Sequence, residues 1–192
     1  RLLENIILPD SVTDIGSYAF ACCTSLRSVV IPKGVTEVKD WTFQECKNLS
    51  DVTIPESVKI LGKGAFDSCS ALVTIKLPKS MSSIREVAFW HCTALVKIAL
   101  PENISEISSQ TFQFCNSLRD IYIPSSVKKI NSCAFDKCTS LSNVYFGGSE
   151  ETWNNILISD GRPSYDTYNG NKYLTNSFIK RYWNQTATVI GY

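Results

Sequence analysis

Eight cysteines and a single histidine, His91, are the chemically most versatile residues of this 192-residue chain. Such side chains can bind zinc, form disulfides, or supply a thiolate nucleophile that an imidazole activates. Six of the cysteines recur at a fixed interval of 23 residues: Cys23, Cys46, Cys69, Cys92, Cys115 and Cys138. A fixed interval indicates a position in a repeating structure, so the chemistry of these thiols depends on how the repeats stack.

If each repeat forms one coil of a stack, the six cysteines form a linear ladder along it. Neighbouring Cα atoms would lie about 5 Å apart, within the disulfide range, but parallel stacking keeps the Cβ atoms farther apart than the roughly 3.8 Å that a disulfide prefers. A line of ligands also cannot make the tetrahedron that zinc requires. We therefore expect buried free thiols, with disulfides as the alternative, and no metal or other cofactor. Cys22 and Cys133 lie off the ladder, about five coils apart, and should not pair with each other.

His91 could act as a general base, but catalysis of that kind also needs a nucleophile and an orienting carboxylate. It stands between Trp90 and Cys92, and the ladder turns the Cys92 side chain inward. The sequence contains no Gly-x-Ser-x-Gly motif, no phosphate-binding loop and no metal-binding motif. We therefore expect a protein that is not an enzyme.

The interval of 23 residues extends to other positions and defines a repeat that occurs six times without an insertion. Its landmarks are Pro9, Pro32, Pro55, Pro78, Pro101 and Pro124; Phe20, Phe43, Phe66, Phe89, Phe112 and Phe135; and Leu26, Leu49, Leu72, Leu95, Leu118 and Leu141. A fixed period of this length indicates a solenoid in which each coil packs on its neighbours. Residues 1–8 match the second half of a repeat, so we expect a fragment of a longer array or a mature product of one.

Each repeat ends in Leu-x-x-Val/Ile-x-Ile/Leu, as in Leu72, Ile75 and Leu77. This alternation of β-branched and polar residues predicts a short strand, and one strand per coil gives a parallel sheet. Proline after the strand suits a turn because it donates no hydrogen bond to the sheet. The middle of the repeat, which contains Phe66 and Cys69, predicts a single turn or a 3₁₀ segment. Phe66 and its five equivalents should be buried and in contact from coil to coil.

The pattern P-x-S-V-x-x-I-x-x-x-A-F-x-x-C-x-x-L-x-x-V-x-I repeats in phase from Leu3 to Phe146 and resembles the BspA-like leucine-rich repeat family of surface proteins. The resemblance implies an α/β repeat solenoid. This would be a right-handed arc with a parallel β-sheet on its concave face and short turns or 3₁₀ segments on its convex face. It also implies an extracellular or cell-surface location and, for some members, adhesion to host proteins.

The repeat breaks at Gly147-Gly148, which divides the chain into a solenoid over residues 1–146 and a C-terminal cap over residues 147–192. The solenoid comprises the half repeat 1–8 and six repeats from residue 9. In the cap, Ser149 and two following glutamates predict a short helix, and Trp153 could cover the end of the core. We expect a loop over residues 160–172 and strands or extended segments over residues 173–183 and 186–192.

The charges are balanced and scattered, with 19 Lys and Arg residues against 18 Asp and Glu residues. This distribution offers no basic surface for nucleic acid or for an anionic membrane. No apolar run approaches the roughly 18 residues of a membrane-spanning helix. We therefore expect neither a nucleic-acid partner nor a membrane span in this chain.

A binding surface is expected on the concave face, where the strand of each coil turns side chains outward. Tyr122 and Tyr145 fall at one such position in adjacent coils, with Arg119 and Asp120 beside them. Tyrosine and arginine are enriched among the residues that carry binding energy in protein interfaces. The alternative is aromatic stacking between strands that only stabilises the sheet. Both interpretations of these four residues remain open.

The repeat array and this candidate surface predict a non-enzymatic interaction protein that is exported or displayed at a surface. Its expected partner is a protein, with host and matrix proteins as the candidates, which the concave face would bind in adhesion. The alternative is a structural spacer or stalk within a larger surface protein.

Overall fold

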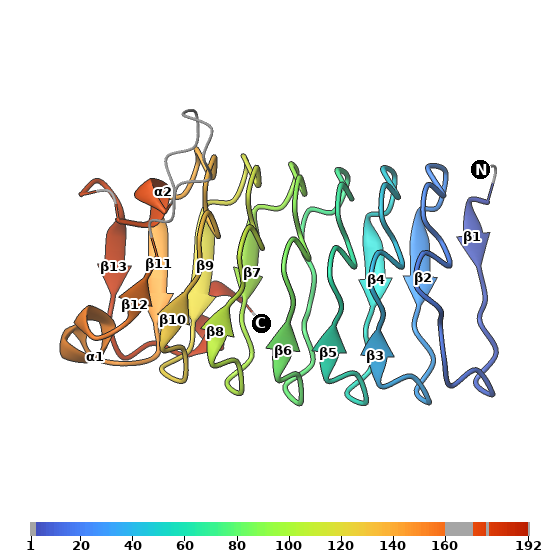
Figure 1. The fold of residues 1–192 in the computed structure, drawn as a ribbon, viewed down its shortest axis with the longest axis horizontal. Coiled ribbons are helices and arrows are strands. Elements are labelled where there is room, and N and C mark those ends of the chain that lie inside the picture. Colours follow the sequence, from blue (N-terminus) through green and yellow to red (C-terminus); the bar gives the residue numbers. More distant parts are fainter. Residues whose placement is uncertain (1–2, 160–170, 176, 192) are drawn as a thin grey trace.

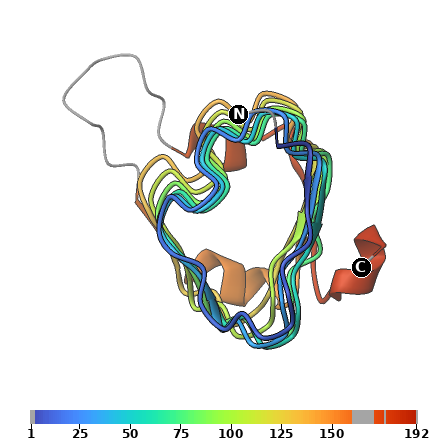
Figure 2. The same ribbon diagram turned by 90° about the vertical axis from the view of Figure 1, so that its right-hand side faces the viewer.

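The computed structural model describes residues 3–159, 171–175 and 177–191. Figure 1 shows the coils side by side in a nearly straight row. Figure 2, which looks along this row, shows them superimposed as a ring around a common interior. Each repeat of the sequence is therefore one coil of a solenoid, as expected.

The strand that closes each repeat forms one flank of the ring. These strands are β1 (Asn5–Ile6), β2 (Ser28–Val30), β4 (Asp51–Thr53), β7 (Lys97–Ala99), β9 (Asp120–Ile123), β11 (Asn143–Phe146) and β13 (Lys180–Tyr182). They pair in parallel in the orders β1-β2-β4 and β7-β9-β11-β13. On this flank, the repeat between β4 and β7 contributes only an isolated bridge, from Thr74 to Lys97. We call these strands, together with Thr74, the first sheet, and they confirm the predicted parallel strands.

A second parallel sheet, which was not predicted from the sequence, forms another flank, and we call it the second sheet. Its strands are β3 (Glu37–Val38), β5 (Ile60–Leu61), β6 (Ser83–Ile84), β8 (Glu106–Ile107), β10 (Lys129–Ile130) and β12 (Leu157–Ile158). They pair in the orders β3-β5-β6 and β8-β10-β12. Each strand is two residues long, which is too short for an alternating pattern to be visible in the sequence.

The two sheets correct the expected α/β class. Because both consist of parallel strands, the fold is a parallel β-solenoid. Within the described residues, helix occurs only in the C-terminal part, at α1 (Glu150–Asn154), α2 (Lys172–Thr175) and the 3₁₀ helix η1 (Ala187–Ile190). The middle of each repeat forms turns, in which residues such as Gly64 and Ser68 have positive φ angles of 59° and 58° and interrupt helical winding. Two flanks of the stack thus consist of strands spaced by about 4.8 Å, and the row curves little (Figure 1).

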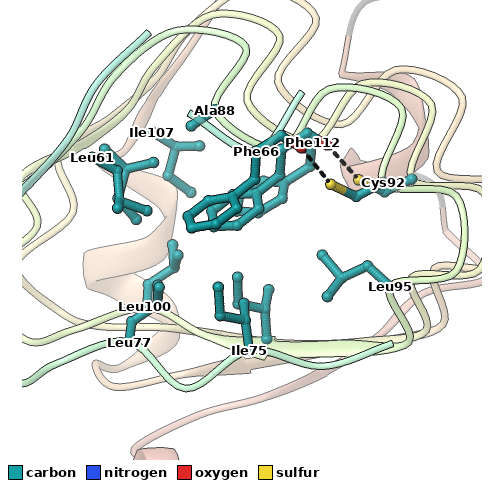
Figure 3. Packing of buried hydrophobic residues seen from close by; sticks show 14 of the residues in the cluster. Leu61, Phe66, Ile75, Leu77, Ala88, Cys92, Leu95, Leu100, Ile107 and Phe112 are labelled. Carbon is teal, nitrogen blue, oxygen red and sulfur yellow. Dashed lines mark hydrogen bonds between the residues drawn. The ribbon is translucent and has the colours of Figure 1, made fainter. Parts of the chain in front are cut away.

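The interior is filled by ladders of identical residues. Five phenylalanines have no exposed surface: Phe43, Phe66, Phe89, Phe112 and Phe135. The phenylalanine rings of successive coils stack with centroids 5.4–5.7 Å apart. Figure 3 shows this stack beside leucine and isoleucine side chains such as Leu61, Ile75, Leu100 and Ile107. Phe20 is half-buried because it stacks on Phe43 alone, so the predicted burial is confirmed for the five inner rings.

The cysteine ladder lies beside the phenylalanines, and none of the eight cysteines, all of which the structure describes, forms a disulfide. In each of the five buried rungs, the cysteine Sγ donates a hydrogen bond of 3.1–3.2 Å to the phenylalanine carbonyl of the preceding coil. Figure 3 shows this bond from Cys92 to Phe66. Burial raises the pKa of Cys46 to about 12 and raises the pKa of Cys69 well above its ordinary value. The expected ladder of buried thiols without disulfides is therefore confirmed for these five rungs, whereas Cys23 at the sixth is half-buried.

Aromatic side chains cover the C-terminal end of this core. The helix α1 begins at Ser149, whose Oγ accepts a hydrogen bond of 3.3 Å from the backbone N–H of Thr152. Trp153 is buried and packs edge-on against Phe146, with ring centroids 5.2 Å apart, and it also contacts Trp183. The short helix thus lies where the sequence predicts it, and its buried Trp153 packs against Phe146 of the last repeat strand.

The rest of the cap differs from the expectation of extended segments. Helix α2 and the 3₁₀ helix η1 take up parts of the expected extended segments, and of the residues described there only 180–182 form a strand. Strand β13 pairs with β11 and so continues the first sheet. The loop expected over residues 160–172 falls largely outside the described residues.

Asn171 completes the backbone hydrogen bonds of the last turn. In the earlier coils, the phenylalanine N–H donates to a backbone carbonyl of the next coil, as Phe43 does to Ala65 at 2.9 Å. In the sixth repeat, the Phe135 N–H donates instead to Oδ1 of Asn171 at 3.1 Å. The Nδ2 of Asn171 donates to two backbone carbonyls, both at 2.9 Å. The side-chain amide thus substitutes for the backbone of a further coil.

Replacing Asn171 with leucine should therefore lower the free energy of unfolding by about 1–3 kcal/mol, because the Phe135 N–H would be buried without an acceptor. Asn48→Leu is the matched control, since Asn48 is exposed and its replacement should change stability by only about 0.5 kcal/mol. Urea denaturation of both variants measures the difference. Equal losses in the two variants would show that the Asn171 amide does not close the stack.

Candidate interaction surface

The outer face of the first sheet carries the side chains that point away from the core. Side chains alternate along a strand, so each coil contributes two positions to this face. We define the outer face by these residues: Ser28, Val30, Asp51, Thr53, Thr74, Lys76, Lys97, Ala99, Asp120, Tyr122, Asn143, Tyr145, Lys180 and Tyr182. The register places Tyr145 opposite Tyr122 on one side and Tyr182 on the other.

The four residues predicted as a binding cluster lie together on the C-terminal half of this face, but they differ in exposure. Arg119 is exposed, and its Nε donates to Oδ2 of Asp120 at 2.9 Å. Asp120 is buried, and its Oδ1 accepts a bond of 2.6 Å from Nδ2 of Asn143. Tyr145 is half-buried, whereas Tyr122 is only 2% exposed. In this arrangement, Arg119 and Tyr145 are accessible and Tyr122 is covered.

The C-terminal segment covers Tyr122 by folding back over the outer face. In Figure 2, the red helical turn beside the letter C lies outside the ring of coils. Ile190 of this turn, η1, is buried in a small cluster with Ala99 and Tyr122, and Ala187 packs against the same cluster. The Nζ of Lys97 donates to the carbonyl of Ile190 at 2.8 Å. This segment was expected to be an extended part of the C-terminal cap, and nothing in the repeat pattern predicts its contact with the outer face.

The hydroxyl groups of both predicted tyrosines stay protonated to higher pH than usual. The Tyr122 hydroxyl donates to Oε1 of Glu102 at 2.6 Å, and burial together with this bond raises the Tyr122 pKa. Burial also raises the Tyr145 pKa, and the Asp120 carboxylate raises it further. Both side chains can therefore act as hydrogen-bond donors throughout the neutral range.

Tyr182 belongs to the accessible cluster although the sequence analysis did not single it out. Its ring stacks on Tyr145 with centroids 4.8 Å apart and planes 12° from parallel, and it remains 37% exposed. The repeat pattern does not predict strand β13 as part of the sheet, because Arg181 stands opposite Val144, where the repeats have an aliphatic residue. The only available signal was a tyrosine two residues after Lys180, which matches the spacing of Tyr145 from Asn143.

The N-terminal half of the outer face is open. Val30 is 62% exposed, and Asp51, Thr53 and Thr74 are also exposed. Two depressions adjoin this half where the strands run into the proline turns. One has a volume of about 520 Å³, and its lining includes Val30, Pro32, Thr53 and Pro55. The other has a volume of about 290 Å³, and its lining includes Thr53, Ile54, Lys76 and Pro78.

His91 lies away from this face, on the turns. Its ring lies between Trp90 and Phe114, with centroids 4.0 Å and 4.3 Å away. Burial lowers the His91 pKa, although the Asp67 carboxylate acts in the opposite direction. Its ring contacts are therefore aromatic, and they favour a packing role. Across the described residues, no three His, Cys, Asp or Glu side chains form a group that could hold a metal ion.

A stack of parallel strands with leucine and phenylalanine ladders at a 23-residue period defines a leucine-rich repeat solenoid. The chain belongs to the BspA-type leucine-rich repeat family. The sequence model of this family, a BspA type leucine rich repeat region in six copies, matches residues 2–80 and 42–160. The match confirms the resemblance found in the repeat. A search among curated proteins found no match.

Solved bacterial structures share this fold. The chain is similar to the T. pallidum leucine-rich repeat protein, with 27% identity, a TM-score of 0.70 and coverage of 74% of this chain and 72% of that one. A leucine-rich repeat protein from Eubacterium ventriosum is 21% identical with a TM-score of 0.58, over 84% of this chain and 55% of that one. The pneumococcal vaccine antigen PcpA is 16% identical with a TM-score of 0.68, and the match covers 95% of this chain and 42% of that one. The present chain thus spans about half the length of the last two structures, whose similarity concerns the fold.

Among the described residues, no helix combines the length and the apolar character needed to cross a membrane.

Proposed function

We propose that this protein binds other proteins through the outer face of the first sheet. Family membership supports a role in protein interaction or at a surface. The observation that carries the proposal is the stacked pair Tyr145 and Tyr182, which is partly exposed on the sheet with Arg119 close enough to affect the Tyr145 pKa. Tyrosine and arginine are the residue types that most often anchor a protein interface.

The surroundings of this pair favour binding because they fix the side chains in advance. Asp120 holds the Arg119 guanidinium, and Asn143 in turn holds the Asp120 carboxylate. The two tyrosine rings support each other, and their strands are paired along their length. Groups that are already ordered lose less conformational entropy when a partner binds. In this proposal, Asp120 and the covered Tyr122 support the surface from beneath, while Arg119, Tyr145 and Tyr182 meet the partner.

The proposed partners are host or matrix proteins, and the proposed location is extracellular or at a cell surface. Membership of the BspA-type family supports this location, because the resemblance to that family implies a surface protein. A row of coils that present side chains at fixed intervals also suits an extended partner surface. The proposed activity is non-catalytic adhesion.

A screen of immobilised host and matrix proteins tests this function. The double variant Tyr145→Ala, Tyr182→Ala should bind any partner at least about thirtyfold more weakly than the wild type, since a central tyrosine anchor contributes about 2 kcal/mol. Tyr18→Ala is the matched control, because Tyr18 is 55% exposed and stacks on Trp41 in the turns. Thermal unfolding of each variant checks that the fold is kept. Unchanged affinity in the double variant, or an equal loss in Tyr18→Ala, would move the site off the outer face.

A spacer is the second candidate function, and the nearly straight row of coils in Figure 1 favours it. A straight solenoid can hold another module at a fixed distance without binding anything itself. A broad screen that yields no partner would support the spacer and would contradict the adhesion proposal.

A further inference from the structure

The contact between η1 and the outer face has the properties of a ligand seated in a site. One aliphatic side chain, Ile190, is buried against Ala99 and Tyr122, and Ala187 adds a second apolar contact three residues earlier. One charged donor, Lys97, binds the Ile190 carbonyl at 2.8 Å. Small ligand sites commonly combine an apolar surface with one or two fixed polar groups in this way. We call the surface formed by Lys97, Ala99 and Tyr122 the seat.

An open depression continues from the seat. It has a volume of about 310 Å³ and lies between η1 and the proline turns, with Leu77, Leu100 and Pro101 among its apolar lining residues. Lys76 and Leu77 also line the neighbouring depression of about 290 Å³, so the two adjoin. A polypeptide seated like η1 could therefore extend along the ends of the strands toward the N-terminal coils.

The C-terminal segment is held at the seat by few contacts. Ile190 is the only buried residue of η1, and Val189 beside it is 44% exposed. The segment adds no strand to the first sheet, whose last described strand is β13. Elements with little buried apolar surface open at low free-energy cost compared with a packed core. A competing segment of the same chemistry could therefore displace this one while the solenoid stays folded.

We propose that the seat is a binding site for an aliphatic turn segment of a partner polypeptide, and that residues 186–191 of the chain occupy it in place of that partner. The proposal rests on the proposed function, because it assigns a ligand class to part of the same outer face. Tyr145 packs against the cluster at the seat and makes the seat continuous with the accessible Tyr145 and Tyr182 pair.

The occupying segment defines the chemistry that a partner must supply. Two aliphatic side chains stand three residues apart in a single 3₁₀ turn, and the backbone carbonyl of the second accepts the Lys97 bond. Gly191 then ends the turn with a φ of 80°, and a Cβ at this position would lie 3.3 Å from the Lys97 Nζ. A partner segment should therefore contain two aliphatic residues at this spacing followed by glycine, a residue that adopts positive φ without strain.

The test uses full-length variants and a fluorescent synthetic peptide with the sequence of residues 185–192. Ile190→Lys should empty the seat, because it places a second ammonium group beside Lys97. Val189→Lys is the matched control, since it adds the same charge on the exposed side of the turn and leaves the seat filled. The peptide should bind Ile190→Lys at least about tenfold more tightly than the wild type or Val189→Lys, because a tethered segment competes at a millimolar effective concentration. Equal binding by all three proteins, or binding by none, would overturn the proposal.

Hydrogen exchange in the wild type provides a second measurement that needs no variant. The N–H of Val189 bonds to Thr186 and the N–H of Gly191 bonds to Thr188, at 3.1 Å and 3.0 Å. Excess peptide should speed the exchange of these two amides and leave the amides of β7 and β9 unchanged. Unchanged exchange at Val189 and Gly191 would contradict the proposal. If partner binding still depends on Tyr145 and Tyr182, such a failure would leave the proposed function standing.

Discussion

Replacing Phe66 with alanine is expected to lower the free energy of unfolding by about 3–5 kcal/mol, the usual cost of removing a large buried aromatic side chain. Phe66 has no exposed surface, and its ring stacks on Phe43 and Phe89 at 5.4 Å and 5.7 Å. The turns on either side are fixed by backbone bonds to both adjacent coils, so the space left by the ring should not collapse. Loss of one ring therefore interrupts the ladder at its centre.

Phe20→Ala is the matched control, because Phe20 is half-buried and stacks on Phe43 alone. Its replacement should cost clearly less than that of Phe66, since coils near the end contribute fewer contacts between neighbours. Reversible urea denaturation, followed by circular dichroism, measures both. Equal costs for Phe20 and Phe66, or a cost for Phe66 below about 1 kcal/mol, would contradict the stacked core.

The free energy of unfolding is also expected to fall by about 6 kcal/mol between pH 9 and pH 10, because five buried thiols each contribute up to about 1.4 kcal/mol per pH unit. Burial raises the pKa of each of these thiols: Cys46, Cys69, Cys92, Cys115 and Cys138. Below the ordinary thiol pKa of about 8.5, both the folded and the unfolded states are protonated, and stability does not depend on these groups. Above it, only the unfolded state loses the protons, so stability falls as the pH rises.

The double variant Cys69→Ser, Cys92→Ser separates this effect from other alkaline changes. A serine hydroxyl can still donate to the phenylalanine carbonyl of the preceding coil, but it does not titrate in this range. The fall in stability between pH 9 and pH 10 should shrink by about two-fifths in the variant. Denaturation curves at pH 7, 9 and 10 with a reductant present give the slopes. The same slope in both proteins would show that these thiols are not the groups that titrate.

The first sheet and the ladders were predictable from the sequence because a strict period converts spacing along the chain into contacts between coils. Phe66, Cys69 and Leu72 each recur in every repeat, so their burial followed from the repeat alone. The second sheet was not predicted because Ile60–Leu61 and its equivalents are too short to show a strand pattern. The α/β label came from the resemblance and is not confirmed, because both sheets consist of parallel strands and the described residues contain little helix.

The candidate surface was only partly predictable, because its exposure depends on a segment outside the repeat. The positions of Tyr122 and Tyr145 on one face followed from the period, and the register confirms them. Tyr122 is covered by Ile190, which lies 68 residues later in the sequence, in a stretch without periodicity. Spacing within the repeat carries no information about such a contact. The burial of Asp120 likewise depends on polar bonds to Arg119 and Asn143 rather than on an apolar pattern.

Hydroxyl-radical footprinting of the protein with a partner from the matrix-protein screen tests the central claim most directly. Tyr182 and Tyr18 are both exposed tyrosines, one on the outer face and one in the turns, so each should be oxidised in the free protein. If the outer face of the first sheet is the binding surface, the partner will protect Tyr182 and Tyr145 and leave the oxidation of Tyr18 unchanged. Protection of Tyr18, with Tyr182 still oxidised at its free rate, would contradict the claim.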